Sequence, residues 1–477
     1  MLAGVIKPQT SLEIQGVIEA SRQHKIKLYP ISAGRNWGYS DSMPATDHNV
    51  IVDLSLMQGI RNYDPEMGTV TIEPGVTQQQ LGDFLRAQGG LHVISVTGSS
   101  PEASIIGNYL ERGFGLLPVM DHAYSVMSLR AIMGNGDLYQ SPLLSCGAEK
   151  SASLFRWGVG PYTDGLFFQS SFGIVTEMTI RLARRAESTQ VCFIEVGDEN
   201  RLWHALPLLR ELRESWPLET LQIKILNGYY TLASMGFKKD DIDAAGGYQR
   251  ALKRYDVPPY TLMISVSGAS ALSRVMVNEI RHRFSFSRRL IVLNERLIKI
   301  GRLAAPLLPA KMKHKISSAE SLWSLLQGQP GTAMIGKIPY FRMSNNANLQ
   351  LDHPAQDRCG IIWFALSLPL TRKGVEDFQS LTAYAEKDCG FSPIVNYTNY
   401  NHVSCIGLLA IVFNQEIETR LAQDCYQELM TRALGQGYFP YRLPSFAAQA
   451  YFDEHSVKLN RQLGKLLDPD QIFSRQC

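Results

Sequence analysis

The stretch at residues 30–39 constrains the fold most, because a short strand pattern ends there and a loop of small residues begins. Ile26 and Leu28 form the strand pattern, and Gly34 and Gly38 in the loop can adopt the positive φ angles that other residues avoid. Such a backbone turns successive N–H groups toward one concavity, which binds a diphosphate without needing a lysine. A glycine-rich segment after a strand is also a common plain turn, so both interpretations stay open at this point.

Helix and strand patterns alternate around this loop, which predicts an α+β fold. Thr10 and Glu13 have the spacing of a capping box, as do Thr77 and Gln80, and an amphipathic helix pattern follows each pair. Short β-branched runs predict strands at residues 49–54, 69–73, 125–133 and 176–182. Beyond residue 185 the helix patterns become longer, which predicts a second domain.

The composition fits a globular protein of two or three domains, and the charge argues against some partners. The 477 residues are 45% hydrophobic, and 47 Lys and Arg residues against 44 Asp and Glu residues give a formal net charge of +3. Because the positive and negative charges are nearly equal in number, nucleic acid or an anionic membrane is not expected as the main partner. No apolar run reaches the roughly 20 residues of a membrane span, and the first residues lack a secretion signal, so we expect a cytoplasmic protein. The scattered cysteines and histidines show no metal-ligand spacing, so no metal site is expected.

Several short motifs follow one another in a fixed order along the chain. They lie at residues 29–39, 73–77, 106–113 and 173–176, with Tyr441-Arg442 and residues 467–469 near the C-terminus. Together these motifs resemble the vanillyl-alcohol oxidase and p-cresol methylhydroxylase family. The resemblance implies a PCMH-type FAD-binding domain of two α/β subdomains over residues 1–185, completed by about 437–477. Residues 186–436 would then form a cap or substrate domain, with a large antiparallel sheet flanked by helices.

The resemblance also implies FAD as the cofactor and assigns residues to it. The loop would grip the diphosphate, the segment around residue 105 would line the flavin, and the strand at 174–176 would contact the adenosine half. The implied cofactor-binding residues are Ser32, Ala33, Gly34, Arg35, Asn36, Trp37, Gly38, Pro74, Ser99, Ser104, Ile105, Gly107, Asn108, Gly173, Ile174, Val175, Thr176 and Arg442. Taken singly, such residues are as well explained by turns, helix caps and a buried strand.

Three residues are the implied catalytic groups: Tyr39, Tyr441 and Arg442. In relatives that tether flavin through the loop, a histidine stands where this chain has Tyr39, so that linkage is absent here. In the vanillyl-alcohol oxidase branch, two tyrosines and an arginine hold a phenolate, which favours hydride loss from its para carbon to the flavin. The alternatives are core packing for Tyr441 and a surface ion pair for Arg442.

Three positions depart from the family pattern. Ser99 stands where the family has an acidic base, with Glu102 as a nearby substitute or a mere surface group, and Leu116 replaces a tyrosine of the polar pocket. Gly407 aligns with the histidine that carries covalent flavin, and His402 lies five residues earlier. We therefore expect dissociable FAD.

The expected function is an FAD-dependent oxidoreductase that takes a hydride from a phenolic or similarly activated small molecule. Oxygen or a protein acceptor would receive the electrons, and a homodimer is expected from the resemblance. One alternative is an oxidase of a larger biosynthetic intermediate, acting by desaturation or oxidative cyclisation. Others are a catalytically degenerate flavin-binding electron-transfer or structural subunit, and a nucleotide-sugar reductase that uses NADPH.

Overall fold

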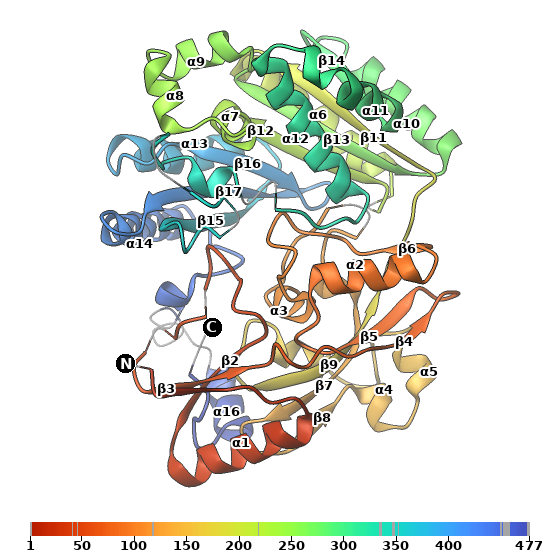
Figure 1. Cartoon of the computed structure of the whole chain (residues 1–477), viewed down its shortest axis with the longest axis vertical. Coiled ribbons are helices and arrows are strands. Elements are labelled where there is room, and N and C mark those ends of the chain that lie inside the picture. Colours follow the sequence, from red (N-terminus) through yellow and green to blue (C-terminus); the bar gives the residue numbers. More distant parts are fainter. Residues whose placement is uncertain are drawn as a thin grey trace.

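The computed structural model describes residues 2–40, 42–44, 46–116, 119–217, 219–332, 336–345, 349–351, 353–448, 451 and 458–474. These residues form two stacked parts, which Figure 1 shows one above the other. The lower part holds the first 185 or so residues and the C-terminal segment, and the upper part holds most of the rest. The mixed helix and sheet content and the large antiparallel sheet confirm the predicted α+β class.

The first sheet of the lower part is small and parallel. Its strands are β1 (Gly4–Ile6), β2 (Lys27–Ile31) and β3 (Asn49–Asp53), in the order β1-β3-β2. Helix α1 (Ser11–His24) makes the connection from β1 to β2, and the Thr10 side chain caps it by accepting from the Glu13 N–H at 3.2 Å. Ile14 and Ile18 of α1 are fully buried against this sheet. The loop of interest starts where β2 ends.

The second sheet of the lower part is antiparallel, in the order β4-β5-β9-β7-β8. Its strands are β4 (Ile60–Asp64), β5 (Thr69–Ile72), β7 (Val126–Met133), β8 (Leu138–Gln140) and β9 (Gly173–Arg181), and β6 (His92–Val93) pairs separately with β10 (Ala183–Arg184). The helical segments are α2 (Gln78–Ala87), α3 (Ile105–Leu110), η1 (Ala123–Ser125), α4 (Pro142–Ser145), α5 (Glu149–Ala152) and η2 (Thr163–Phe167). The four predicted strands are all present, and Thr77 and Gln80 form the predicted capping box of α2.

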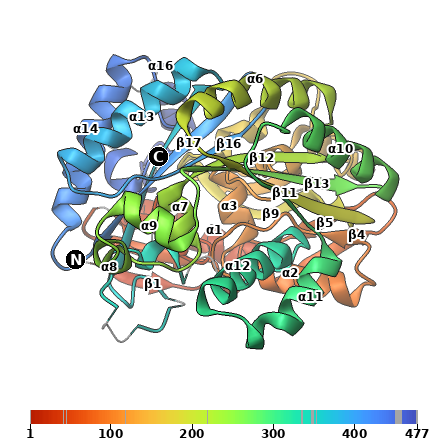
Figure 2. The same cartoon turned by 90° about the horizontal axis from the view of Figure 1, so that it is seen from above.

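The upper part, here called the cap, is built on a seven-stranded antiparallel sheet in the order β14-β11-β13-β12-β16-β17-β15. Its strands are β11 (Ser188–Val196), β12 (Leu221–Asn227), β13 (Tyr260–Gly268), β14 (Leu290–Leu293), β15 (Cys359–Pro369), β16 (Ile394–Asn399) and β17 (Ser404–Asn414). Helices α6 (Glu199–Ser215), α10 (Ser270–Arg283), α13 (Arg372–Lys387) and α14 (Thr419–Gly435) cover one face of this sheet (Figure 2). The other face turns toward the lower part.

Further helices lie on the second side of the cap sheet (Figure 2). They are α7 (Gly228–Ser234), α8 (Lys239–Ala244), α9 (Tyr248–Tyr255), α11 (Glu295–Ala304), η3 (Ala305–Leu307), α12 (Ala310–Leu326) and η4 (Ile338–Tyr340). Because side chains alternate between the faces of a strand, every second residue of the sheet faces the helices of the first side. On β12, for example, Leu221, Ile223 and Ile225 pack into that helical core. Lys224 and Leu226 face the opposite way.

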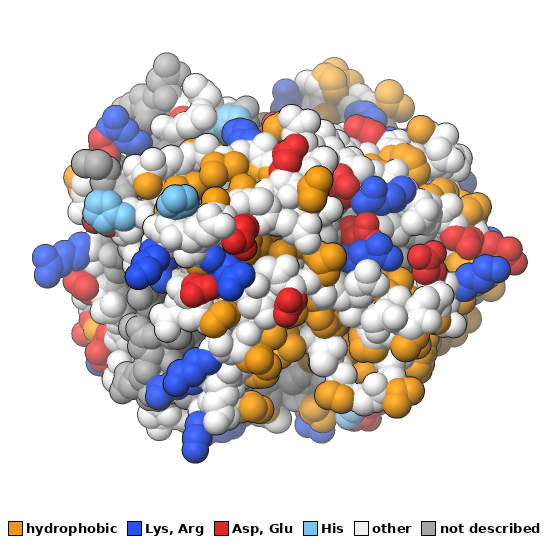
Figure 3. All heavy atoms as spheres, turned by 90° about the horizontal axis from the view of Figure 1, so that it is seen from below, with side chains coloured by type: hydrophobic (Ala, Val, Ile, Leu, Met, Phe, Trp, Pro, Cys, Tyr) orange, Lys and Arg blue, Asp and Glu red, His pale blue; other side chains and the backbone are white. Residues whose placement is uncertain are grey.

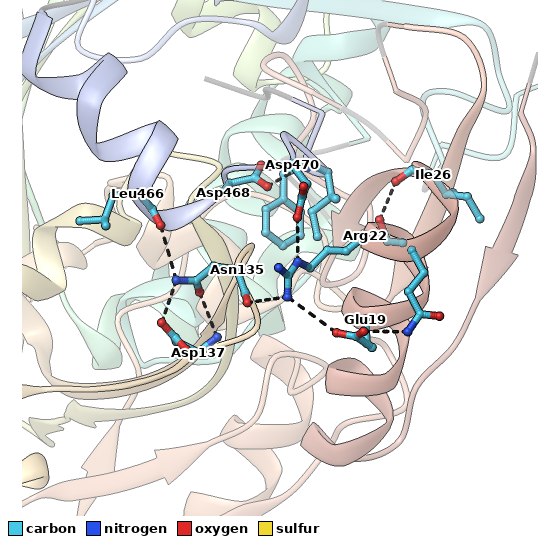
Figure 4. A network of polar contacts seen from close by, with 12 residues as sticks. Glu19, Arg22, Ile26, Asn135, Asp137, Leu466, Asp468 and Asp470 are labelled. Carbon is cyan, nitrogen blue, oxygen red and sulfur yellow. Dashed lines mark hydrogen bonds and ion pairs between the residues drawn. The ribbon is translucent and has the colours of Figure 1, made fainter.

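The C-terminal segment returns from the cap to the lower part and packs beside β2. Helix α16 (Lys458–Leu467) precedes it, and the backbone of Leu28 accepts from Ser474 at 2.9 Å and donates to Ile472 at 2.7 Å. Figure 4 shows Arg22 of α1 pointing toward this segment, where its Nε donates to Asp470 at 2.8 Å. The lower part is therefore completed by residues from the far end of the chain.

The lower surface of the molecule carries Lys, Arg, Asp and Glu side chains of both signs, interspersed with hydrophobic ones (Figure 3). No region of a single charge dominates that face. Among the described residues, no helix combines the length and the hydrophobicity that crossing a membrane requires.

Candidate functional site

A cavity of about 790 Å³ lies between the lower part and the cap sheet. Most of the predicted site residues line it: Ser32, Ala33, Gly34, Arg35, Asn36, Trp37, Tyr39, Ser99, Ser104, Gly107, Asn108, Gly173, Ile174, Val175, Tyr441 and Arg442. Four others, Gly38, Pro74, Ile105 and Thr176, lie behind this lining. The fold thus brings together segments that are more than 400 residues apart in the chain.

The loop after β2 reaches up to the cap and touches strand β15 (Figure 1). Gly34 and Gly38 have φ angles of 62° and 87°, as the sequence predicts. The backbone N–H of Trp363 donates to the Gly38 carbonyl at 3.1 Å, and its indole N–H donates to the Trp37 carbonyl at 3.1 Å. A Cβ atom at Gly38 would lie 2.2 Å from the Trp363 ring, so only glycine fits here. The cap therefore holds the loop in place.

The second predicted segment meets this loop at the start of α3. The Ser104 hydroxyl accepts from the Gly107 N–H at 3.0 Å and donates to the Pro74 carbonyl at 2.7 Å. A Cβ atom at Gly107 would lie 3.3 Å from the Ser32 hydroxyl, so the backbone of α3 runs close to the loop. Ile105 is buried in the core behind the cavity. Pro74 and Ile105 thus support the cavity wall, which Ser104 and Gly107 form.

Asn108 in the cavity wall is held from behind by His122. His122 Nδ1 and Asn108 Oδ1 are 2.6 Å apart, and the His122 ring stacks on Tyr109 with 4.6 Å between ring centres. Burial lowers the pKa of His122 to about 3, so the imidazole is neutral at physiological pH and Nδ1 carries the donated proton. His122 does not line the cavity. It therefore positions Asn108.

Arg442 is the centre of a buried polar cluster. Its Nη2 donates to Asn36 Oδ1 at 2.8 Å and lies 3.3 Å from Glu111 Oε2. Its guanidinium carbon lies 3.8 Å from the centre of the Tyr39 ring. The interpretation of Arg442 as part of a surface ion pair is wrong, since only 5% of the residue is exposed. The motif at residues 106–113 contains Glu111, but no pattern near that residue indicates that it pairs with Arg442.

The protonation states of this cluster follow from burial and from its neighbours. Burial raises the pKa of Tyr39 well above its ordinary value, and Tyr441 raises it further while Arg442 opposes the change. Burial by itself lowers the pKa of Arg442, but the acidic and phenolic groups of Tyr39, Glu111 and Tyr441 more than offset it, so the net pKa is raised. Tyr39 is therefore a neutral hydrogen-bond donor and Arg442 a fixed cation.

Two atoms of this cluster are buried without a hydrogen-bond partner among the described residues. They are the Tyr39 hydroxyl oxygen and Arg442 Nε. A buried donor without a partner costs about 1–3 kcal/mol, more when it is charged. Since both residues line the cavity, a polar ligand atom placed there would satisfy them.

The strand at 173–176 contributes to the cavity in part. Gly173, Ile174 and Val175 of β9 line it, whereas the Thr176 hydroxyl donates to the Arg130 carbonyl at 3.3 Å. The contact of residues 174–176 with the adenosine half, expected through backbone groups of an edge strand, stays a prediction, but β9 is the middle strand of its five-stranded sheet and not an edge strand. Leu116 is buried and lines the cavity, so this part of the wall is apolar.

Ser99 lies in the cavity wall without a carboxylate beside it. Its hydroxyl is 2.5 Å from the Thr97 hydroxyl and accepts from Gln78 at 3.3 Å. Glu102 forms an ion pair with Arg35 and has a 57% exposed side chain, so it is a surface group and not a substitute base. The carboxylates that do line the cavity are Glu111, Glu195 and Asp256, and each has a cationic partner: Arg442, Arg289 and Lys315 respectively.

The alignment that places the tethering histidine at Gly407 does not match the geometry. A Cβ atom at Gly407 would lie 2.5 Å from Leu368 and 3.1 Å from Phe378, on the helix-covered face of the sheet. The next residue, Leu408, faces the cavity instead. His402 is exposed in the turn before β17 and does not line the cavity. No described histidine or cysteine lines it.

Comparisons with known proteins agree with this geometry. An FAD binding domain family matches residues 2–141. The chain is 28% identical over 492 residues to 1'-carboxy-chondrochloren decarboxylase of Chondromyces crocatus, covering 99% of this chain and 90% of that protein. It is 32% identical over 213 residues to the flavoprotein subunit of 4-cresol dehydrogenase (hydroxylating) of Pseudomonas putida, covering 45% of this chain and 41% of that protein.

Solved structures share the whole fold. The structure of p-cresol methylhydroxylase with substrate bound has a TM-score of 0.84 and 21% identity, covering 98% of this chain and 87% of that one. The chain carries an FAD binding domain and has the fold of p-cresol methylhydroxylase. A further structure with this fold, the isoeugenol complex of 4-ethylphenol oxidase from Gulosibacter chungangensis, has a TM-score of 0.81 and 18% identity, covering 98% of this chain and 88% of that one. The protein is an FAD-dependent oxidoreductase.

The residues of the cavity fit the family's cofactor. The positive-φ glycines and exposed backbone of the loop would hold the diphosphate, and Ser104, Gly107 and Asn108 would line the ring system. The cap sheet covers the cavity from above with largely apolar side chains, which suits a flavin ring. Bound FAD would supply the acceptor for a hydride.

Proposed function

We propose that this enzyme oxidises a 4-alkylphenol at the side-chain carbon attached para to the hydroxyl group, with Tyr39, Tyr441 and Arg442 holding the phenol oxygen. The observation that carries the proposal is the buried Arg442 stacked on Tyr39, with a tyrosine hydroxyl and a guanidinium N–H that lack partners among the described residues. Such convergent buried donors in a cavity wall fit an oxygen that gains negative charge. The fold by itself does not argue for any one substrate.

Each residue of the cluster has a part in this chemistry. Arg442 stays charged and stabilises the phenolate form of the substrate, and Tyr39 stays protonated and donates a hydrogen bond. Glu111 and Asn36 accept from Arg442 and fix the direction of its guanidinium plane. The phenol then loses its hydroxyl proton to solvent, and the side-chain carbon attached at the para position loses a hydride to the acceptor. The organic product of this two-electron oxidation is a quinone methide.

The fate of that quinone methide is where this chain departs from its relatives. In the vanillyl-alcohol oxidase branch an acidic residue at the position of Ser99 serves as base. With Ser99 bonded to Thr97, the cavity has no free carboxylate among the described residues to activate water. Reactions that need no such base are therefore favoured.

Oxidative decarboxylation is the second candidate, and the relative that matches across 99% of the chain favours it. If a carboxylate sits on the carbon next to the oxidised one, the bond to that carboxylate breaks and CO₂ leaves. The electron pair of the broken bond forms a carbon–carbon double bond and restores the aromatic ring as a phenolate, which then takes up a proton. The net change is loss of CO₂ and of one hydride, and no water is activated.

We further propose that FAD is not covalently attached, because no described histidine or cysteine lines the cavity. Acid precipitation of the purified protein tests this: the yellow colour should stay in the supernatant. A yellow pellet would contradict it and would point to a tyrosine of the cavity wall, such as Tyr230.

The function is tested by anaerobic bleaching of the holoenzyme. A panel of 4-alkylphenols, 4-hydroxybenzyl alcohols and 3-(4-hydroxyphenyl)propanoates should bleach the flavin, and their O-methyl ethers, which cannot form a phenolate, should not. Release of CO₂ and an alkene from the propanoates selects decarboxylation. If no phenol bleaches the flavin, the proposal is wrong, and bleaching by NADPH alone would indicate a reductase instead. The rate of recolouring in air separates oxygen from a protein acceptor.

A further inference from the structure

Lys224 stands in the cavity-facing side of the cap sheet, on the central strand β12. Most neighbours on that face are apolar, including Met263 beside it on β13 and Leu226 two residues along. The exceptions are Glu195 on β11, Thr261 on β13 and two residues of β16. On β16, Thr398 is directly opposite Lys224 in the register, and Asn396 is two residues away. The Thr398 hydroxyl donates to the Asn396 side-chain oxygen at 3.1 Å. One lysine, one hydroxyl and one amide thus form a small polar cluster in an apolar wall.

The cations that line the cavity differ in whether they have a counter-ion. Arg442 pairs with Glu111, Lys315 with Asp256, and Arg35 with Glu102. Lys224 also lines the cavity, but in the described part of the chain it has no acidic partner and no hydrogen bond. Burial lowers the pKa of Lys224 to about 8, which leaves most of it charged at neutral pH. A desolvated cation without a counter-ion is unfavourable unless a ligand supplies one.

The position of Lys224 in the sheet sets its place relative to the phenol end. The end of the cavity proposed to hold the phenol oxygen lies beside β15. Two residues of β15 show this: Trp363 contacts the loop after β2, and the Ala365 carbonyl accepts from the Tyr441 N–H at 3.2 Å. In the sheet order, β12 is three strands from β15. At about 4.8 Å between neighbouring strands, the two backbones are roughly 14 Å apart, a gap that the four-carbon lysine side chain shortens. A simple cresol is too small to occupy both places.

We propose that Lys224, with Asn396, binds a carboxylate of the substrate, so that the enzyme takes phenols with an acidic group on the para side chain. This rests on the proposed function, which places the phenol oxygen at Arg442. Asn396 completes the receptor, because a carboxylate has more acceptor sites than one ammonium group satisfies and the Asn396 side-chain NH₂ group can donate to it. The Thr398 hydroxyl donates to the Asn396 side-chain oxygen and thereby orients that amide. The substrate class is therefore a 4-hydroxyphenyl compound with an anionic side chain.

The test compares ligands that differ only in charge, using the FAD-loaded enzyme. The dissociation constants of 3-phenylpropanoate and of its amide are measured from the perturbation of the flavin spectrum, which requires no turnover and no phenol. Lys224→Met should weaken binding of the acid by about 30-fold or more and leave the amide within about threefold. Lys224→Arg should keep most of the preference for the acid. Lys337→Met is the matched control, since Lys337 is largely buried in the cap but does not line the cavity, and it should change neither constant.

Two results would overturn the proposal. Equal weakening of acid and amide in Lys224→Met would show that the residue only shapes the cavity. A shift in the flavin reduction potential with no loss of acid preference would assign Lys224 to the cofactor. Because these ligands lack a phenol, the outcome is independent of whether 4-alkylphenols bleach the wild-type flavin. Failure of the phenol chemistry and failure of the anion site are thus seen separately.

Discussion

The contact between Gly38 and Trp363 provides a sharp test of how the cap holds the cofactor loop. In Gly38→Ala the new Cβ would lie 2.2 Å from the Trp363 ring, at a φ of 87°. The left-handed backbone costs a residue with a Cβ about 1–2 kcal/mol. Overpacking costs typically 1–3 kcal/mol, and moving Trp363 removes two hydrogen bonds worth about 1 kcal/mol each. The total of about 4–7 kcal/mol is large enough to displace the loop from its native position.

We therefore expect Gly38→Ala to bind FAD at least about 100-fold more weakly and to unfold at a lower temperature. FAD content follows from the ratio of flavin to protein absorbance, the affinity from titration of the apoprotein, and stability from thermal unfolding with and without added FAD. Gly236→Ala is the matched control, because Gly236 has a φ of 89° but nothing within 4 Å of the position of its Cβ. It should cost only the backbone strain and leave FAD binding unchanged.

A second variant separates collision from strain. Gly38→Ala combined with Trp363→Leu makes room for the new Cβ and should recover part of the lost FAD affinity. If Gly38→Ala binds FAD as well as Gly236→Ala does, the cap does not hold the loop and the reasoning fails.

Three further predictions concern the site and its supports. A lysine in Arg442→Lys cannot reproduce the hydrogen bonds that the planar guanidinium makes to Asn36 and Glu111. We therefore expect the rate of flavin reduction by a phenol, measured by anaerobic stopped flow, to fall about 100-fold or more, with FAD content retained. A decrease of less than tenfold would show that Arg442 does not take part in the chemistry. The pKa of His122 is about 3 in the folded protein against 6.5 in the unfolded chain, so only the unfolded state gains a proton as the pH falls below 6.5. Protonation of this group should therefore lower the free energy of unfolding by up to about 1.4 kcal/mol per pH unit. In urea titrations between pH 7 and 4.5, His122→Gln should lose this part of the pH dependence. Position 407 faces Leu368 and Phe378, so Gly407→His should lower the free energy of unfolding by about 1–3 kcal/mol. After acid precipitation of this variant, the flavin should stay in the supernatant. A yellow pellet would show that this face of the sheet reaches the flavin.

The amino-acid sequence by itself determined the features that depend on residues close together in the chain. The caps at Thr10 and Thr77 and the positive φ of Gly34 and Gly38 all follow from local backbone chemistry, and all are present. The order of the motifs was enough to identify the FAD-binding fold and the α+β class. The same motifs named most of the residues that line the cavity.

Only the tertiary structure decided which side chains face the cavity and which groups pair across it. Glu111 and Arg442 are 331 residues apart, and nothing near either one signals the other. Counting along a single sequence put the tethering position at Gly407, whereas the sheet turns Leu408 to the cavity and Gly407 to the helices. Lys224 gave no local signal at all. In a strand each step of one residue reverses the face, and the pairing with distant strands alone fixes which face is which.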